Sequence, residues 1–168
     1  GVTVKLFDEN GKEVPRGEVG RIFVRNTFPF EGYTGGGHKQ IIDGLMSSGD
    51  VGYFDEHGLL YVSGRDDEMI VAGGEDVFPA EIEDLLSGHP EIVEATAIGV
   101  EDKEWGQRLR AFVVKAEGSD LDEDEVKRYV REHLARYKVP RDVIFLDELP
   151  RNPTGKILKR ELRELEVS

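Results

Sequence analysis

The alternation of hydrophobic and polar residues predicts strands in the first part of the chain. Residues 2–7 alternate between apolar and polar side chains, as a strand with one buried face does. Residues 19–25 read as a second strand, and residues 51–54 and 59–63 are expected to form a hairpin. The first 64 residues are therefore predicted to be mostly β-structure.

Mixed helix and strand patterns follow. Helical spacing of apolar residues predicts helices at residues 79–87, 122–137 and 157–165. Strands are expected at residues 92–98, 109–114 and 143–146. The second helix has the clearest start, because Asp122 and Glu125 have the spacing of a capping box.

The two patterns meet at Arg65–Asp67. They predict a β-rich part, residues 1–65, followed by a compact mixed domain, residues 66–168, in which helices flank a short sheet. The expected fold class is α+β.

Composition excludes several classes of protein. The net charge is −13 and the acidic residues are spread out, which argues against a nucleic-acid partner. Cysteine is absent, so there is no disulfide framework and no thiolate metal site. The four histidines lack paired ligand spacing, and we predict no metal site within this chain. We expect no transmembrane segment, because no apolar run approaches the roughly 20 residues that a span requires.

The most informative stretch is residues 64–83. An apolar run is followed by Gly73 and Gly74, a second strand-like piece, and Pro79. Glycine adopts backbone angles closed to other residues and lets a ligand approach the main chain. Proline suits the first helical turn, where its missing N–H costs nothing. An ordinary glycine turn in an α+β domain would explain the same pattern.

Two further motifs help to decide between an ordinary glycine turn and a functional motif. Ser48-Gly49-Asp50 lies upstream, and the segment from Pro150 to Lys156 ends in Thr-Gly-Lys. Together with residues 64–83 they resemble the adenylate-forming superfamily, which comprises acyl-CoA and aryl-CoA ligases, luciferases and the adenylation domains of peptide synthetases. The resemblance covers nearly all 168 residues and matches the last third or so of such an enzyme.

The resemblance implies an ATP-binding role for two residues. Asp50 matches the aspartate that holds the ribose of ATP, with Ser48 where the family motif begins with threonine. Arg65 matches an arginine that approaches the nucleotide. Taken alone, Asp50 reads as a turn-capping aspartate and Arg65 as a partner in a surface salt bridge.

Lys156 is the predicted catalytic residue. It stands where we expect a helix to start, and a helix start disfavours a cation. The motif is no Walker loop, because the first glycine and the trailing Ser/Thr are missing. By resemblance, Lys156 enters the active site during adenylation and binds ATP. An exposed lysine beside a turn is the plain alternative.

Domain rotation is a further implication of the resemblance. Asp67 matches the hinge about which the C-terminal domain turns between two half-reactions. Gly73 and Gly74 would line the passage for the pantetheine of CoA. Val71 stands where many members carry a lysine, which puts any role of that lysine in doubt here.

Taken together, these expectations describe the C-terminal part of a fatty-acid–CoA ligase that is inactive alone. Its substrates would be a carboxylic acid, ATP and CoA, with Mg held by ligands outside this chain. Its partner would be the N-terminal domain of the same protein. We expect a cytoplasmic location and leave peripheral membrane association open. A carrier-loading adenylation domain and a non-enzymatic partner-binding module remain as alternatives.

Overall fold

The computed structural model describes residues 1–26 and 40–165. The chain divides into two compact units, Gly1–Asp67 and Glu68–Ser168, here called unit 1 and unit 2. The glycine-rich stretch at 32–37 and His38 lie outside the described residues.

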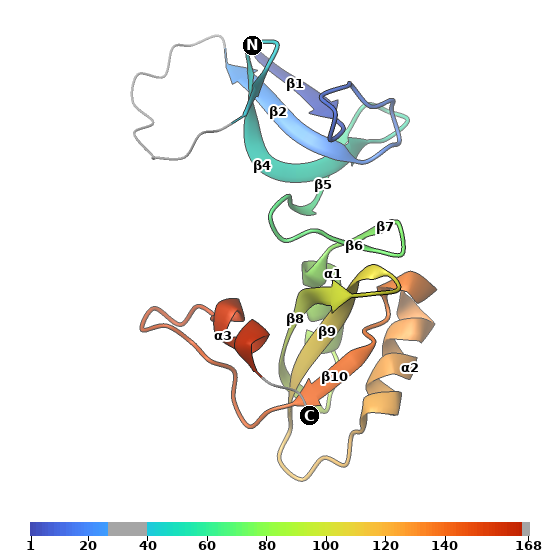
Figure 1. Ribbon diagram of the computed structural model, residues 1–168, viewed down its shortest axis with the longest axis vertical. Helices are drawn as coiled ribbons and strands as arrows, with labels where there is room; N and C mark the ends of the chain where they lie inside the picture. The colour runs from blue at the N-terminus through green and yellow to red at the C-terminus, as the bar shows by residue number, and fades with distance from the viewer. Residues whose placement is uncertain (27–39, 166–168) are drawn as a thin grey trace. The chain divides into compact units, whose positions relative to one another are not determined.

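Unit 1 is built from antiparallel strands (Figure 1). They are β1 (Val2–Phe7), β2 (Gly20–Asn26), β3 (Ile41–Ile42), β4 (Leu45–Phe54) and β5 (Leu60–Arg65). The predicted hairpin is confirmed, since β4 and β5 pair from Asp50 opposite Arg65 to Phe54 opposite Leu60. β4 begins earlier than expected and also pairs with β2.

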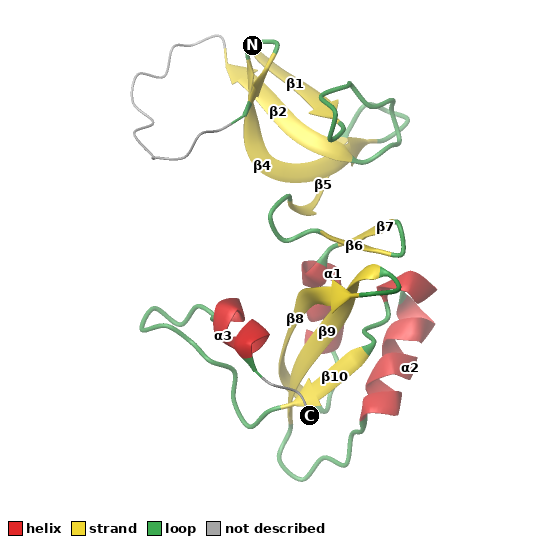
Figure 2. Cartoon of the chain, in the orientation of Figure 1, coloured by secondary structure: helices red, strands yellow, loops and turns green. Residues whose placement is uncertain are grey.

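Unit 2 contains a mixed sheet whose longest strands are antiparallel (Figure 2). The strands are β6 (Ile70–Ala72), β7 (Glu75–Val77), β8 (Ile92–Asp102), β9 (Gly106–Lys115) and β10 (Asp142–Phe145). β9 pairs with antiparallel β8 and with parallel β10. The short β6–β7 hairpin joins β9 through Ala72 and Gly106.

Helices cover both faces of this sheet. On one face, α1 (Pro79–Ser87) and α2 (Glu123–His133) bury apolar side chains against alternate residues of β8 and β9. On the other, α3 (Lys159–Glu164) buries Leu162 against Ile98 and Phe112. The alternation of strand side chains thus yields two small cores, and the predicted α+β class is confirmed.

The first helix follows its sequence signals closely. Pro79 occupies the first turn of α1, and the helix ends at Ser87 before Gly88. The capping box of α2 is also present: Glu125 N donates to Asp122 Oδ1, and Asp122 N donates to Glu125 Oε2.

The predicted end of the second helix is wrong. α2 stops at His133, and a separate 3₁₀ turn spans Arg136–Lys138. The chain is already extended at Val139, because the following Pro140 disfavours the helical conformation there. Tyr137, expected on the core face, is exposed instead.

The last helix is shorter than predicted. It begins at Lys159 rather than at residue 157, and Leu165 lies beyond its end, exposed by 42%. None of the helices in the described ranges is both long and apolar enough to cross a bilayer.

Candidate functional site

Asp50 and Arg65 face each other across β4 and β5. Arg65 Nη1 lies 3.4 Å from Asp50 Oδ1, and Arg65 Nε lies 3.7 Å from Asp67 Oδ1. Gly49 has a φ of +83°, and a Cβ there would lie 3.0 Å from Arg65 Nη2, so glycine leaves room for the guanidinium. The surface salt bridge expected as the plain alternative for Arg65 is therefore present, alongside any role in binding a nucleotide.

The sequence predicted a strand that starts just after Asp50. In the structure Asp50 lies inside β4. Its amide donates to Ser48 Oγ, and that hydroxyl donates to Ile22 O on β2. The polar segment forms a strand because it pairs with two neighbours, which local composition does not reveal. Within the described residues Asp50 Oδ2 has no hydrogen-bond partner, so it is available for a hydroxyl group.

The paired glycines form the turn between β6 and β7, with φ angles of +60° at Gly73 and +83° at Gly74. The two positions differ in their surroundings. A Cβ at Gly73 would lie 2.5 Å from Cε3 of Trp105, whereas a Cβ at Gly74 would meet nothing within 4 Å. Gly73 therefore accommodates the indole ring, and Gly74 faces open space.

Trp105 is held in place by the turn between β8 and β9. Its amide donates to Asp102 Oδ1, and its carbonyl accepts from Gly73 N at 3.0 Å. The hydrogen bond from the Trp105 amide is the largest of several that hold the pKa of Asp102 below its usual value, against the opposing effect of burial. The guanidinium of Arg141 lies 4.7 Å from the centre of a Trp105 ring, a cation–π arrangement.

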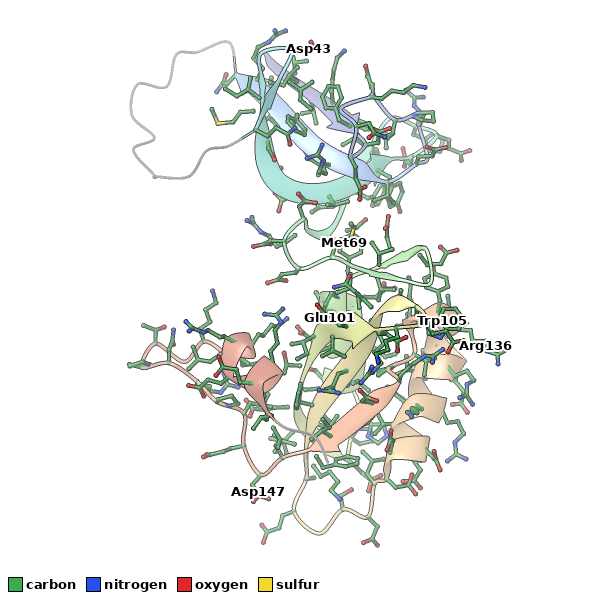
Figure 3. All side chains as sticks on the ribbon, in the orientation of Figure 1. Asp43, Met69, Glu101, Trp105, Arg136 and Asp147 are labelled. Carbon is green, nitrogen blue, oxygen red and sulfur yellow. The ribbon has the colours of Figure 1, made fainter. Side chains whose placement is uncertain are left out.

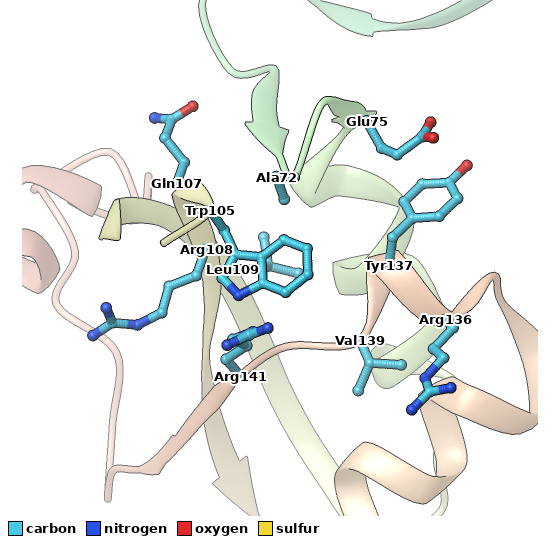
Figure 4. Close-up of a pocket in the computed structure, with 11 residues that line it drawn as sticks. Ala72, Glu75, Trp105, Gln107, Arg108, Leu109, Arg136, Tyr137, Val139 and Arg141 are labelled. Carbon is cyan, nitrogen blue, oxygen red and sulfur yellow. The ribbon is translucent and has the colours of Figure 1, made fainter. Parts of the chain in front are cut away.

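Gly73, Trp105 and Arg141 border a pocket of about 520 Å³ in unit 2 (Figure 4). Trp105 and Arg136 lie at the same end of the unit (Figure 3). Sequence reasoning missed this pocket, although a single tryptophan beside a glycine was a usable signal. An indole face together with guanidinium groups suits an aromatic ligand that carries negative charge.

Arg108 belongs to the wall of this pocket and is anchored by Asp142. Asp142 Oδ2 accepts from Arg108 Nε at 2.9 Å and from Arg110 Nε at 3.0 Å. Burial alone would raise the pKa of Asp142, but hydrogen bonds and charge from the two arginines outweigh burial and lower it.

Asp142→Asn is expected to destabilise unit 2 by about 2 kcal/mol at pH 7, because hydrogen bonds to charged groups contribute about that much. The folded-state pKa of Asp142 lies below its ordinary value of 3.8. The stabilisation is therefore complete above that value and is lost as the pH falls through the lower folded-state pKa. Urea unfolding followed by Trp105 fluorescence should separate variant from wild type at pH 7 and bring them together at low pH. An equal difference at both would contradict a charge-based role.

The structure holds Lys156 in a tight loop rather than at a helix start. Asn152 Oδ1 accepts from the amides of Thr154 and Lys156, and Asn152 N donates to Lys156 O. Arg151 and Ile157 close the loop through a backbone bridge. The helix begins later than predicted because the Asn152 side chain and the bridge between Arg151 and Ile157 hold the preceding residues as a loop. Within the described part of the chain, the Lys156 ammonium is exposed and has no hydrogen-bond or ion-pair partner.

The predicted site residues thus fall into two groups. Asp50 and Arg65 are in contact in unit 1, while Gly73, Gly74 and Lys156 belong to unit 2. Asp67 is the last residue of unit 1 and contacts Arg65. No group of three or more metal-ligating side chains occurs within the described residues.

Comparison with known proteins finds a matching family model and similar enzymes. Residues 81–156 match the model of the AMP-binding enzyme C-terminal domain. The 2-succinylbenzoate–CoA ligase of Bacillus mycoides is 44% identical over 95% of this chain. The fatty acid–[acyl-carrier-protein] ligase ScoC of Streptomyces coeruleorubidus is 40% identical over 98%. The chain spans about a third of the length of these relatives, 33% and 32%.

Solved structures of related enzymes are similar to this chain as well. ATP-bound MatB from Rhodopseudomonas palustris is 38% identical with a TM-score of 0.77, over 98% of this chain and 34% of that one. The o-succinylbenzoate CoA synthetase of Bacillus subtilis, in complex with an acyl-adenylate, is 33% identical with a TM-score of 0.79 over the same shares. The chain therefore belongs to the adenylate-forming superfamily and carries its AMP-binding enzyme C-terminal domain.

Proposed function

We propose that a protein containing this chain joins a carboxylic acid to CoA in two steps. The acid and ATP first yield an acyl-adenylate and pyrophosphate, and CoA then yields acyl-CoA and AMP. The main support is the exposed ammonium of Lys156, which has no partner among the described residues, on a loop held by Asn152, in a domain whose solved relatives hold ATP or an acyl-adenylate.

In the first step a carboxylate oxygen attacks the α-phosphorus of ATP, and the bond to pyrophosphate breaks. Both reactants are anions, so the step needs positive charge where negative charge develops. Lys156 supplies a mobile ammonium for this purpose. Asp50 Oδ2 has no partner among the described residues and can accept from the ribose hydroxyls, and Arg65 adds a cation next to it.

In the second step the sulfur of CoA attacks the acyl carbonyl, and AMP leaves. Gly74 faces open space and carries no side chain, so a pantetheine arm can pass close to its backbone. The neighbouring pocket, with Trp105 and its guanidinium groups, has the chemistry to bind the nucleotide end of CoA.

The two parts predicted from the sequence then have separate roles. Residues 1–65 would form the end of the adenylation domain, and residues 66–168 the mobile C-terminal domain. Asp67 is the proposed hinge. The described residues contain no cluster fit to hold Mg, so we derive no step through a metal within this chain.

Two classes of carboxylic acid are candidate substrates, and experiment can distinguish them. The sequence favoured a fatty acid, and one relative is named a fatty acid–[acyl-carrier-protein] ligase. Another is named a 2-succinylbenzoate–CoA ligase, which makes an aromatic acid the competing substrate. The carrier-protein name also keeps a carrier thiol as the alternative acceptor.

Acid-dependent exchange of pyrophosphate into ATP tests the first step. The complete protein is assayed with fatty acids of several chain lengths and with 2-succinylbenzoate. We expect exchange with one acid class and none without acid. The acceptor is then tested by adding CoA or a carrier protein to the preformed acyl-adenylate. If none of the tested acids supported pyrophosphate exchange by the complete protein, the enzymatic proposal would be refuted and the partner-binding module would be favoured.

A further inference from the structure

Two carboxylates hold the segment that presents Lys156. We call residues 151–159 the Lys156 segment. Glu94 on β8 binds its first residue, Arg151, and Glu83 on α1 binds its last, Lys159. Lys156 lies between these two ion pairs and takes part in neither.

The first ion pair also organises the loop itself. One guanidinium nitrogen of Arg151, Nη2, contacts Glu94 Oε1. The other, Nη1, donates to the carbonyl of Gly155 at 2.7 Å. Gly155 directly precedes Lys156, so the same side chain ties the loop to β8 and fixes the backbone beside the lysine.

The second ion pair is more deeply seated. Glu83 Oε1 accepts from Lys159 Nζ at 2.8 Å, from Thr96 Oγ1 at 3.0 Å and from Ala97 N at 3.0 Å. Thr96 is only 1% exposed, and the side chains of Lys159 and Glu83 are 24% and 23% exposed. Glu83 thus links α1 on one face of the sheet to α3 on the other, past β8.

The strand geometry explains why Glu94 meets this segment, and why Thr96 is available to bind Glu83. The pairing of β8 with β9 shifts register between Ile92 and Glu94. From there Glu94, Thr96 and Ile98 alternate onto the face that α3 covers. Ile157 of the segment packs against the cluster that contains Ile98 and Leu162, which gives the segment an apolar anchor as well.

We propose that Glu83 and Glu94 are positioning residues for adenylation, a role that rests on the proposed function. By holding both ends of the Lys156 segment, they restrict the backbone from which the ammonium reaches. A group held in place before reaction avoids the entropic cost of being ordered during it. The contacts leave the ammonium itself free to bind the reacting phosphate.

The proposal is tested in the complete protein with Glu83→Gln, Glu94→Gln and the double variant. Each substitution keeps the size of the side chain and removes its charge. We expect adenylation to fall about threefold in each single variant and about tenfold in the double variant, the range for partly exposed ion pairs. Transfer from preformed acyl-adenylate to CoA should stay unchanged. Glu164→Gln is the matched control, because Glu164 forms an exposed ion pair with Arg160 in α3.

Two further measurements separate positioning from general stabilisation. In a Lys156→Ala background, the glutamine variants should cause no additional loss of adenylation. A charge exchange, Glu94→Arg with Arg151→Glu, should recover the activity that depends on the ion pair, but not the part that depends on the hydrogen bond from Arg151 to the Gly155 carbonyl. Equal losses in both half-reactions, or full additivity with Lys156→Ala, would overturn the proposal.

Hydrogen exchange keeps this test independent of enzymatic activity. In the 168-residue chain the amides of Gly155 and Lys156 donate to Asn152. Their exchange should accelerate about tenfold in the double variant and stay unchanged in Glu164→Gln, if the two ion pairs order the loop. Unchanged exchange would refute the positioning role. Absence of acid-dependent activity in the wild type would instead refute the proposed function.

Discussion

Lys156→Ala is expected to reduce acyl-adenylate formation by about 10²–10³-fold, the usual cost of losing one preorganised charge contact in a transition state. The structure supports a localised effect, because the ammonium has no partner within the described residues and its backbone is held by Asn152. Folding should therefore be unaffected. Single-turnover formation of the acyl-adenylate from acid and ATP measures the first step directly.

The same variant should transfer preformed acyl-adenylate to CoA at the wild-type rate. Arg160→Ala is a suitable control, since it removes a neighbouring exposed cation that we assign no role. Comparable losses in both half-reactions would exclude a role for Lys156 confined to adenylation. Acyl-adenylate formation at the wild-type rate in Lys156→Ala would exclude any catalytic role of Lys156 in adenylation.

Gly74→Leu is expected to leave acyl-adenylate formation intact and to slow its transfer to CoA by about 10²-fold, the scale set by misplacing a reacting group. A Cβ at Gly74 meets no atom of the described residues within 4 Å, so a new side chain would project into free space. The new side chain should therefore obstruct the approach of CoA. The measurement is the rate of acyl-CoA formation from preformed acyl-adenylate at varied CoA concentration.

Backbone strain needs its own control, because Gly74 has a φ of +83°. Gly118 provides one: its φ is +78°, and a Cβ there also meets nothing within 4 Å. Gly118→Leu should carry similar strain without slowing transfer to CoA. If both variants lose transfer equally, strain rather than obstruction is the cause, and the placement of CoA at Gly74 fails.

Gly73 illustrates how two adjacent glycines acquire different roles. The sequence placed both on the CoA passage. In the structure a Cβ at Gly73 would collide with the Trp105 ring, so this glycine is required by the protein itself. A substitution there would disturb the pocket and the turn together. Gly74 is for that reason the cleaner test of the passage.

Local signals in the sequence predicted much of the fold. The capping box at Asp122 and the proline at residue 79 act through neighbours in the chain. The starts of α1 and α2 were placed correctly because the contacts that stabilise them lie within a few residues. The same holds for the positive φ angles at Gly73 and Gly74, which the paired glycines indicated.

The sequence by itself therefore determined the α+β class, most elements, and the motif residues that identify the superfamily. Tertiary structure alone decided that Asp50 lies within a strand opposite Arg65, and that Trp105 meets Gly73. It also decided that Glu83 and Glu94 hold the Lys156 segment, across separations of 76 and 57 residues. These features depend on sheet register and on packing between distant segments, and no local pattern of side chains encodes such contacts.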